Sequence, residues 1–275
     1  MSYTIKSYIR SDNSVPAYEK RLSICLEPNG FSFSETTVKN DLLSLGEADY
    51  DAKAPLAEQI ASLKACFGEL GIQSLGYDMV ELVVPARQFA WVPDHLFDAT
   101  KEKQYLETVC VPEVGKAVMS DHSEMLQSHI VFGADSTLTT AMKIALPGLK
   151  VRCQHSKLAC QTLADSSDMR SVMLMNLKEG YADFEVFCNH RLQLSNSFGC
   201  CNQDEALYHA LNLMKTLNLE DDKMVLMLSG NADRELYSRV SRYFPNVELY
   251  TGRKLKPANP DMLKVHTYRY AEVLS

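Results

Sequence analysis

The sequence predicts an α/β protein with mixed sheets, in which one βββαβα unit occurs twice. The two copies lie around residues 22–97 and 171–244. Each copy opens with an apolar strand and a turn, and later runs an amphipathic helix into a buried strand. That helix and strand occupy 56–70 and 79–84 in the first copy, and 204–217 and 223–229 in the second. Repetition of this kind indicates a duplicated structural unit, although a fold alone does not define an activity.

The size of the chain leaves room for two domains. It has 275 residues, of which 46% are hydrophobic and 23% charged, as in ordinary globular proteins. The polar run Asp165-Ser-Ser-Asp168 separates the two copies. We therefore expect one domain over residues 1–165, with extra helices and strands after residue 101, and a second over 166–275.

Charge and hydropathy exclude several classes of partner. The net charge of −7 does not provide the basic field that neutralises phosphates, so no nucleic-acid partner is expected. No stretch approaches the roughly 18 apolar residues that span a bilayer, so no membrane insertion is expected. The first ten residues lack the apolar core of a secretory signal, which favours a cytoplasmic location.

Cysteines and histidines show no metal-binding pattern. The eight cysteines contain no Cys-x-x-Cys motif, and the vicinal pair Cys200-Cys201 is expected to pack inward in a strand-to-helix connection. Asp121-His122, His129 and His155 are dispersed along the chain. We therefore predict no metal site.

Local patterns assign most elements of the first copy. Pro28-Asn29-Gly30 between two alternating runs predicts a hairpin over 21–34. The acidic stretch Asn40 to Asp51 is interpreted as a loop. Pro55 then begins a helix that Gly71 ends. After a strand at 79–84, Asp94 is expected to be the N-cap of a further helix, followed by a helix near Tyr105, a strand at 129–132, a helix at 138–146, a strand at 150–153 and a helix at 156–163.

The second copy shows a more regular pattern. Three runs joined by hairpin-type turns predict an antiparallel meander at 171–177, 181–188 and 191–198. A helix at 204–217 and a strand at 223–228 follow. The segment Ser229-Gly230-Asn231 leads into a helix at 232–243 and a last strand at 247–250. Such alternation after a meander is typical of a mixed α/β layer.

The doubled unit resembles the actin-like ATPase fold, which consists of two ribonuclease-H-like domains. More narrowly, the chain resembles the DUF3822 family of bacterial proteins from Bacteroidetes, whose fold is actin-like. The resemblance rests on the hairpin at 22–34, the strand Val80-Glu-Leu-Val-Val-Pro85 and the whole second copy.

The resemblance implies a nucleotide site in relatives that hydrolyse ATP. Their first hairpin carries Asp-x-Gly and then a Ser or Thr, so that amides wrap a phosphate and the aspartate orients hydrated magnesium. Here that turn is Glu27-Pro28-Asn29-Gly30, followed by Phe31. Pro28 removes an amide donor. Glu27 either replaces the aspartate or is a surface glutamate at the end of a strand.

The two other motifs implied by the resemblance are also altered. The second hairpin has Asn176 where an aspartate is expected, and an amide cannot supply the charge that anchors a metal-bound water. Asp183 is nearby but is expected to face solvent. The third motif, an apolar strand ending in Gly-Gly, matches Ser229, Gly230 and Asn231, which become candidate adenosine contacts. The alternative is a plain strand-to-helix turn capped by Asn231.

The altered hairpins predict a non-catalytic actin-like scaffold or protein-interaction protein. Phosphoryl transfer depends on positioned charge, so the loss of both aspartates should abolish turnover. No catalytic residue, metal or cofactor is assigned, and the partner is expected to be another protein or a second copy in a homodimer. The alternative is a nucleotide-binding protein, or a slow ATPase or kinase, that takes ATP with magnesium in an interdomain cleft, with Glu27 or Asp183 near the metal.

Overall fold

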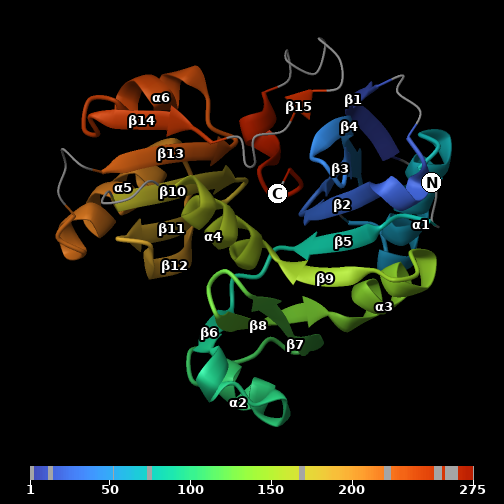
Figure 1. Ribbon diagram of the computed structural model, residues 1–275, viewed down its shortest axis with the longest axis horizontal. Coiled ribbons are helices and arrows are strands. Elements are labelled where there is room, and N and C mark those ends of the chain that lie inside the picture. Colours follow the sequence, from blue (N-terminus) through green and yellow to red (C-terminus); the bar gives the residue numbers. More distant parts are fainter. Residues whose placement is uncertain are drawn as a thin grey trace. The chain divides into compact units, whose positions relative to one another are not determined.

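The computed structural model describes residues 3–11, 15–51, 53–72, 76–166, 171–219, 224–250, 256–257 and 266–274 (Figure 1). The chain forms two compact units. The first comprises Met1–Ser156 and Leu255–Val265, and the second comprises Lys157–Lys254 and His266–Ser275. The domain limits 1–165 and 166–275 stay a prediction, and Asp168 of the polar run behind them lies outside the described residues.

The first unit is built on a seven-stranded mixed sheet in the order β1-β4-β3-β2-β5-β9, with β15 also paired to β4. Strands β1 to β4 pair antiparallel, whereas β5 and β9 run parallel to β2. Their bounds are β1 Tyr3–Arg10, β2 Lys20–Glu27, β3 Gly30–Thr37, β4 Asp41–Tyr50, β5 Met79–Val84, β9 Lys150–Cys153 and β15 Lys256–Pro257, with a 3-10 turn at Ala17–Glu19.

Helix α1 (Leu56–Glu69) packs its apolar side against this sheet, as its spacing predicts. The ring of Phe67 meets those of Phe31 and Phe33 edge-on, with centroids 5.5 and 5.6 Å apart. Gly71 follows the helix with φ +66°, a left-handed conformation that a glycine adopts without strain. The predicted end of the helix is therefore confirmed.

The prediction of a loop over Asn40 to Asp51 is wrong, because Asp41–Tyr50 form β4, which lies between β1 and β3 in the sheet. Leu42, Leu45 and Ala48 are buried on β4, which pairs with β1 on one side and β3 on the other. The acidic residues that suggested a loop are neutralised from the neighbouring strand, since Lys6 Nζ lies 2.8 Å from Asp49 and 3.5 Å from Glu47. Their charge is therefore compatible with a sheet.

A group of extra elements between β5 and α3, here called the insertion, adds a three-stranded antiparallel sheet in the order β6-β8-β7 to the first unit (Figure 1). The predicted helix near Tyr105 and strand at 129–132 are present, whereas β6 and β7 were not predicted. The elements are β6 Phe89–Pro93, 3-10 turns at Asp94–Leu96 and Ala99–Lys101, α2 Glu102–Glu107, β7 Lys116–Ser123, β8 Ser128–Asp135 and, after it, α3 Ser136–Ala145.

The expected N-cap role of Asp94 is wrong. Pro93 precedes a turn of three residues, Asp94–Leu96, and no side chain caps it. The Asp94 carboxylate instead approaches two histidines. Asp135 does cap a helix, since its Oδ1 accepts a hydrogen bond from Leu138 N at 2.8 Å at the start of α3.

The second unit holds a five-stranded sheet in the order β12-β11-β10-β13-β14. The predicted meander, helix and strands are present, with α6 shorter than expected. Asp233, and not Asn231, caps α6, because Asp233 Oδ1 accepts from Leu236 N at 2.7 Å. The elements are α4 Gln154–Asp165, β10 Ser171–Lys178, β11 Tyr181–Cys188, β12 Arg191–Gly199, α5 Gln203–Thr216, β13 Val225–Gly230, α6 Arg234–Val240, β14 Asn246–Leu249 and a 3-10 turn at Thr267–Tyr270.

The two main sheets share one topology. The order β4-β3-β2-β5-β9 in the first unit repeats as β12-β11-β10-β13-β14 in the second. In both, a three-stranded antiparallel meander is followed by a helix, α1 or α5, and then by strands parallel to the first strand of the meander. This confirms the duplication predicted from the sequence.

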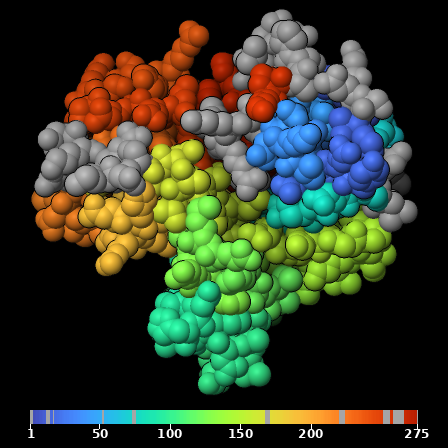
Figure 2. Space-filling model, viewed as in Figure 1, coloured from blue at the N-terminus to red at the C-terminus, as the bar shows by residue number. Residues whose placement is uncertain are grey.

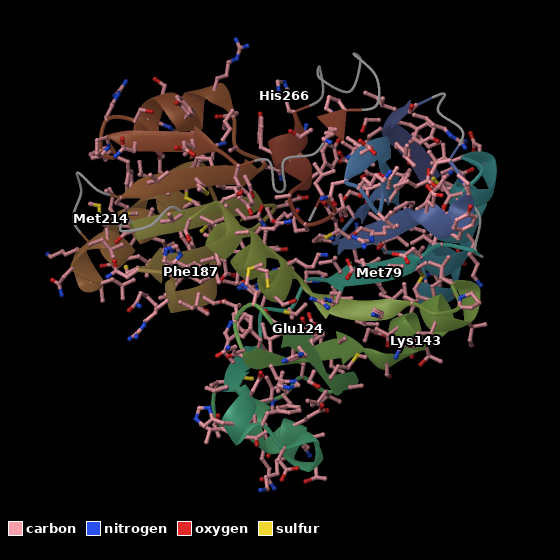
Figure 3. All side chains as sticks on the ribbon, in the orientation of Figure 1. Met79, Glu124, Lys143, Phe187, Met214 and His266 are labelled. Atoms are coloured by element: carbon pink, nitrogen blue, oxygen red, sulfur yellow. The ribbon has the colours of Figure 1, made fainter. Side chains whose placement is uncertain are left out.

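Side chains cover both faces of the second sheet (Figure 3). One face packs Met173, Met175 and Leu226 among the apolar residues of α5 and α6. The opposite face packs Leu174 and Met227 with apolar residues of α4 and of the chain after His266. Because side chains alternate along a strand, the polar residues Asn176, Asp183, Glu185 and Ser229 share this second face.

Candidate functional site

The second hairpin, at which the resemblance implies a phosphate site, contains a buried polar network that we call the Asn176 cluster. It draws on strands β10 to β13 and on the chain after the 3-10 turn at Thr267–Tyr270. Asn176, Asp183 and Ser229 have no exposed surface, and Glu272 is 1% exposed. The members of the cluster are Asn176, Lys178, Asp183, Ser197, Ser229 and Glu272.

Asn176 lies at the centre of the cluster. Its Nδ2 donates to Asp183 Oδ2 at 3.1 Å and to Glu272 Oε1 at 2.8 Å. Its Oδ1 accepts a hydrogen bond from Ser229 Oγ at 2.6 Å. A side-chain amide has two N–H donors and one carbonyl acceptor, so both kinds of group are used inside the protein.

The charged members of the cluster also bind each other. Lys178 Nζ lies 2.8 Å from Glu272 Oε1, and both side chains are almost fully buried. Asp183 Oδ1 accepts from Ser197 Oγ at 2.5 Å. The expectation that Asp183 faces solvent is wrong, because the register places Asp183 opposite Asn176 on the covered face of the sheet.

Ser229 and Gly230 are the last two residues of β13, and Asn231 follows the strand. Gly230 has φ +71°, and a Cβ there would lie only 2.0 Å from the carbonyl oxygen of Leu177. Asn231 N donates to that same oxygen at 2.8 Å, and the exposed Asn231 side chain accepts from Arg269 at 3.4 Å. The close approach of β10 therefore accounts for the glycine, and the adenosine assignment stays a prediction.

The turn of the first hairpin packs against the end of β4. Tyr50 N donates to Asn29 O at 3.0 Å, and the Tyr50 hydroxyl donates to Glu27 O at 3.4 Å. Phe31, where ATP-hydrolysing relatives have a hydroxyl, is buried in the core beside Phe67. The residue in the hydroxyl position thus belongs to the core.

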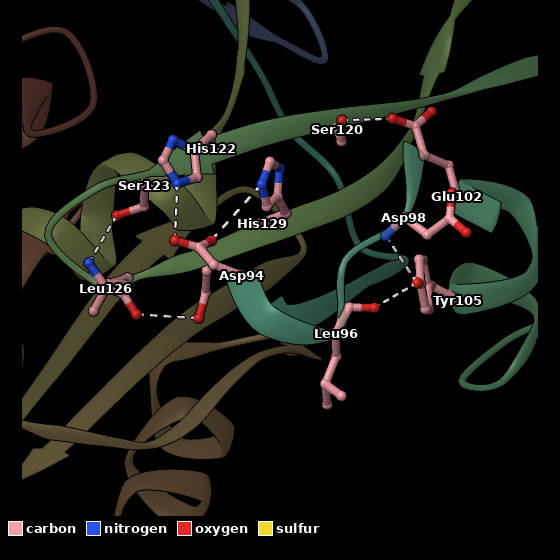
Figure 4. Close-up of polar contacts among 11 residues, drawn as sticks. Asp94, Leu96, Asp98, Glu102, Tyr105, Ser120, His122, Ser123, Leu126 and His129 are labelled. Atoms are coloured by element: carbon pink, nitrogen blue, oxygen red, sulfur yellow. Dashed lines mark hydrogen bonds and ion pairs between the residues drawn. The ribbon is translucent and has the colours of Figure 1, made fainter. Parts of the chain in front are cut away.

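The structure also brings together three residues that the sequence analysis left apart: Asp94, His122 and His129, here called the Asp94 cluster (Figure 4). Strand pairing sets His122 opposite His129, and Asp94 follows β6, whose Pro93 pairs with Ser128. His122 Nε2 lies 3.2 Å from Asp94 Oδ2, and His129 Nε2 lies 3.7 Å from Asp94 Oδ1. A hairpin prediction over 116–135 would have paired the two histidines.

The ring of His129 is held between neighbours. It stacks on Phe97 with the centroids 3.6 Å apart and the planes 5° from parallel, and its centroid lies 4.5 Å from that of His122. Partial burial lowers the pKa of His129, and the adjacent His122 lowers it further. Both effects favour the neutral imidazole, which is the form that can bind a metal.

None of the eight cysteines, all of which lie within the described residues, is part of a disulfide. Cys200 packs into the core of the second unit, as expected. Cys201 is exposed, so the prediction that both sulfurs of this pair pack inward is wrong for the second one.

The topology of both units defines the actin-like ATPase fold. A protein from Bacteroides thetaiotaomicron VPI-5482, described as having this fold and unknown function, is similar with a TM-score of 0.74 and 23% identity, over 91% of this chain and 96% of that one. The chain belongs to the family described as protein of unknown function (DUF3822), whose model matches residues 11–247.

Two further solved structures share the fold at lower identity. The PilM–PilN type IV pilus biogenesis complex matches with a TM-score of 0.56 and 11% identity, over 94% of this chain and 97% of that one. The ethanolamine utilization protein EutJ from Carboxydothermus hydrogenoformans matches with a TM-score of 0.52 and 8% identity, over 97% and 93%. No curated protein matches the sequence. Among the described residues, no helix has the length and apolar character needed to cross a membrane.

Proposed function

We propose that this chain is a non-catalytic member of the actin-like fold that acts as a cytoplasmic scaffold or protein-interaction protein. The Asn176 cluster carries the proposal. At the hairpin where relatives place an aspartate for hydrated magnesium, this chain has a neutral amide bonded to Asp183, Glu272 and Ser229. Phosphoryl transfer depends on charges placed around phosphate and metal, and these side chains bind one another instead.

The first hairpin supports the same conclusion. Pro28 has no N–H to offer a phosphate, and Phe31 replaces a hydroxyl with a ring buried in the core. Gly230, the residue that best fits a nucleotide motif, is accounted for by its contact with Leu177 O. These contacts, all among the described residues, support the non-catalytic proposal over the alternative of ATP with magnesium.

Calorimetry tests the non-catalytic part of the proposal. ATP with magnesium is titrated into the purified chain, and phosphate release is followed in parallel. We expect no binding heat and no release above that of buffer. Binding that disappears in Asn231→Trp, a change at an exposed candidate adenosine contact, would overturn the proposal. Thermal unfolding gives a second readout, since a ligand at a hundredfold excess over its Kd raises stability by about 2.7 kcal/mol.

The interaction part of the proposal is supported by exposed apolar side chains in the insertion. Val109, Val111 and Val114, between α2 and β7, are 58%, 86% and 104% exposed. Figure 2 shows this part of the first unit at the surface, in teal and green. The three exposed side chains lie within six positions of one another in the sequence, and exposed apolar surface can mark a protein-interaction site. We propose that the partner, another protein or a second copy of this chain, contacts this segment; a structure that shares the fold is itself the PilM–PilN complex.

Crosslinking in cells of the source organism tests this surface. The comparison uses the wild type, a triple variant with Val109, Val111 and Val114 changed to Ser, and a control with Ile144→Ser, which removes a 75% exposed apolar side chain on α3. We expect one crosslinked species to be lost only in the triple variant, and its mass distinguishes a homodimer from another partner. Identical crosslinks in all three proteins would contradict the proposed surface.

A further inference from the structure

We infer that the Asp94 cluster binds a divalent transition-metal ion of the zinc class, through the Nε2 atoms of His122 and His129 and one carboxylate oxygen of Asp94. The site lies in the insertion, uses none of the residues that carry the proposed function, and does not depend on it. It is built by strand pairing, because His122 and His129 face each other across β7 and β8.

The distances within the cluster suit a metal site. The ligand atoms all lie within 4.8 Å of one another, and two of the separations are 3.2 and 3.7 Å. In a tetrahedral zinc site with bonds of about 2.0–2.1 Å, ligand atoms lie roughly 3.3 Å apart. The three side chains are 22–42% exposed, so side-chain rotations can bring the ligand atoms to the separation of a tetrahedral site without disturbing a core.

The backbone holds the three ligands in place. Asp94 N donates to Gln127 O at 3.0 Å, which ties the turn after β6 to the turn between β7 and β8. Phe97 stacks on His129 and orients its ring.

The donor set selects the kind of ion. Imidazole nitrogens suit zinc, cobalt, nickel and copper, whereas magnesium and calcium prefer a full set of oxygens. Three protein ligands leave a fourth tetrahedral position for water or a partner's side chain. The proposed site is therefore an open one.

One feature limits the expected affinity. His129 Nδ1 is buried, and within the described part of the chain it has no hydrogen-bond partner. A metal-bound histidine usually donates its other N–H to a carboxylate or carbonyl, and loss of such a partner lowers metal affinity about 10–100-fold. We expect this site to bind zinc more weakly, by that factor, than a site with both imidazoles supported.

Calorimetry with Zn²⁺ on the metal-stripped full chain tests the proposal, with Mg²⁺ as a comparison ion and Co²⁺ as a spectroscopic probe. We expect one zinc ion per chain, no magnesium binding, and cobalt absorption without a thiolate band. His122→Ala and Asp94→Asn should each weaken zinc binding at least about tenfold. His95→Ala, at an exposed histidine next to Asp94, and Cys201→Ser, at an exposed thiol, should leave it unchanged.

Three results would overturn the inference: no zinc binding, binding that His122→Ala leaves intact, or a thiolate band that Cys201→Ser removes. Far-UV circular dichroism checks that each variant is folded. If His122→Ala fails to fold, His122→Gln replaces it, and NMR of the wild type supplies an independent measurement. Co²⁺ should then broaden the ring signals of His122 and His129 before those of His209, and uniform broadening would contradict the site.

Discussion

Replacing Asn176 by Asp tests the interpretation of the second hairpin, because it restores the residue type that binds hydrated magnesium in relatives. In the wild type, Nδ2 of Asn176 donates to Asp183 Oδ2 at 3.1 Å and to Glu272 Oε1 at 2.8 Å. In Asn176→Asp an oxygen replaces this nitrogen and faces both carboxylates. We expect the variant to be strongly destabilised at neutral pH and to gain nothing from magnesium.

The size of the effect follows from these distances. Two unit charges about 3 Å apart repel by about 5 kcal/mol at an effective dielectric constant of 20. Asp183 forms one such pair with the new carboxylate, whereas Lys178 Nζ, 2.8 Å from Glu272 Oε1, offsets part of the repulsion in the second pair. The new carboxyl avoids this repulsion by staying protonated. Holding a group of ordinary pKa about 3.9 neutral costs about 1.4 kcal/mol per pH unit, which is about 4 kcal/mol at pH 7 and about 1.5 kcal/mol at pH 5.

The sign of the pH dependence distinguishes this mechanism from simple loss of contacts. The folded-state pKa of the new carboxyl is raised above its unfolded value, so its cost is absent at low pH and grows as pH rises above about 3.9. Asn176→Ala is the control, because it removes the amide without adding an ionisable group. Leaving the buried partners of Asn176 unsatisfied should cost about 1–3 kcal/mol.

Urea unfolding followed by circular dichroism, at pH 5 and pH 7, measures the free energies of unfolding of the wild type and both variants. After subtraction of the Asn176→Ala effect, the loss in Asn176→Asp should be larger at pH 7 by about 2–3 kcal/mol. An equal loss at both pH values would refute the reasoning. Magnesium-dependent stabilisation of Asn176→Asp would show instead that the hairpin remains open to a metal.

Three further predictions use the same unfolding assay. Burial raises the pKa of Glu185 well above its ordinary value, so above about pH 4.5 only the unfolded chain loses this proton. The free energy of unfolding should therefore fall with pH by up to about 1.4 kcal/mol per pH unit. Glu185→Gln should remove that slope, and an unchanged slope would contradict the prediction. Gly180→Ala should lower the free energy of unfolding by about 1–2 kcal/mol, the cost of a left-handed backbone, because open space surrounds Gly180. Gly230→Ala should lower it by more, because a Cβ at Gly230 meets Leu177 O. Equal losses would argue against that contact. Asp135→Ala should cost about 0.5–2 kcal/mol by removing the cap of α3, and Ser136→Ala, which leaves the cap, should cost less.

Sequence patterns predicted the elements whose signal is local. Pro28-Asn29-Gly30 marked the first hairpin, and alternating runs with short turns marked the meander of the second unit. The spacing of Ile60, Leu63 and Phe67 marked the buried side of α1. In each case the residues that define the element lie within a few positions of each other, so neither distant contacts nor register had to be known.

The predictions that failed depended on neighbours distant in the chain. The acidic residues of β4 suggest a loop. Lys6 balances Glu47 and Asp49 from β1, a strand that no sequence pattern placed beside β4. Asp183 was expected at the surface because alternation within one strand does not reveal which face other segments cover. The Asp94 cluster was missed because the pairing of β6, β7 and β8 decides which histidines meet.

The amino-acid pattern alone established that one α/β unit occurs twice, and it placed Glu27 and Asn176 where the resemblance implies aspartates, because these are properties of short contiguous segments. Tertiary structure alone decided which side chains meet. Glu272 contacts Asn176 from 96 residues further along the chain, and Asp94 contacts His122 although 28 residues separate them. Hydrophobic alternation specifies which side of an element is buried, since burial is set residue by residue. Which segments cover that side depends on strand register and packing, and these exist only once the whole chain has folded.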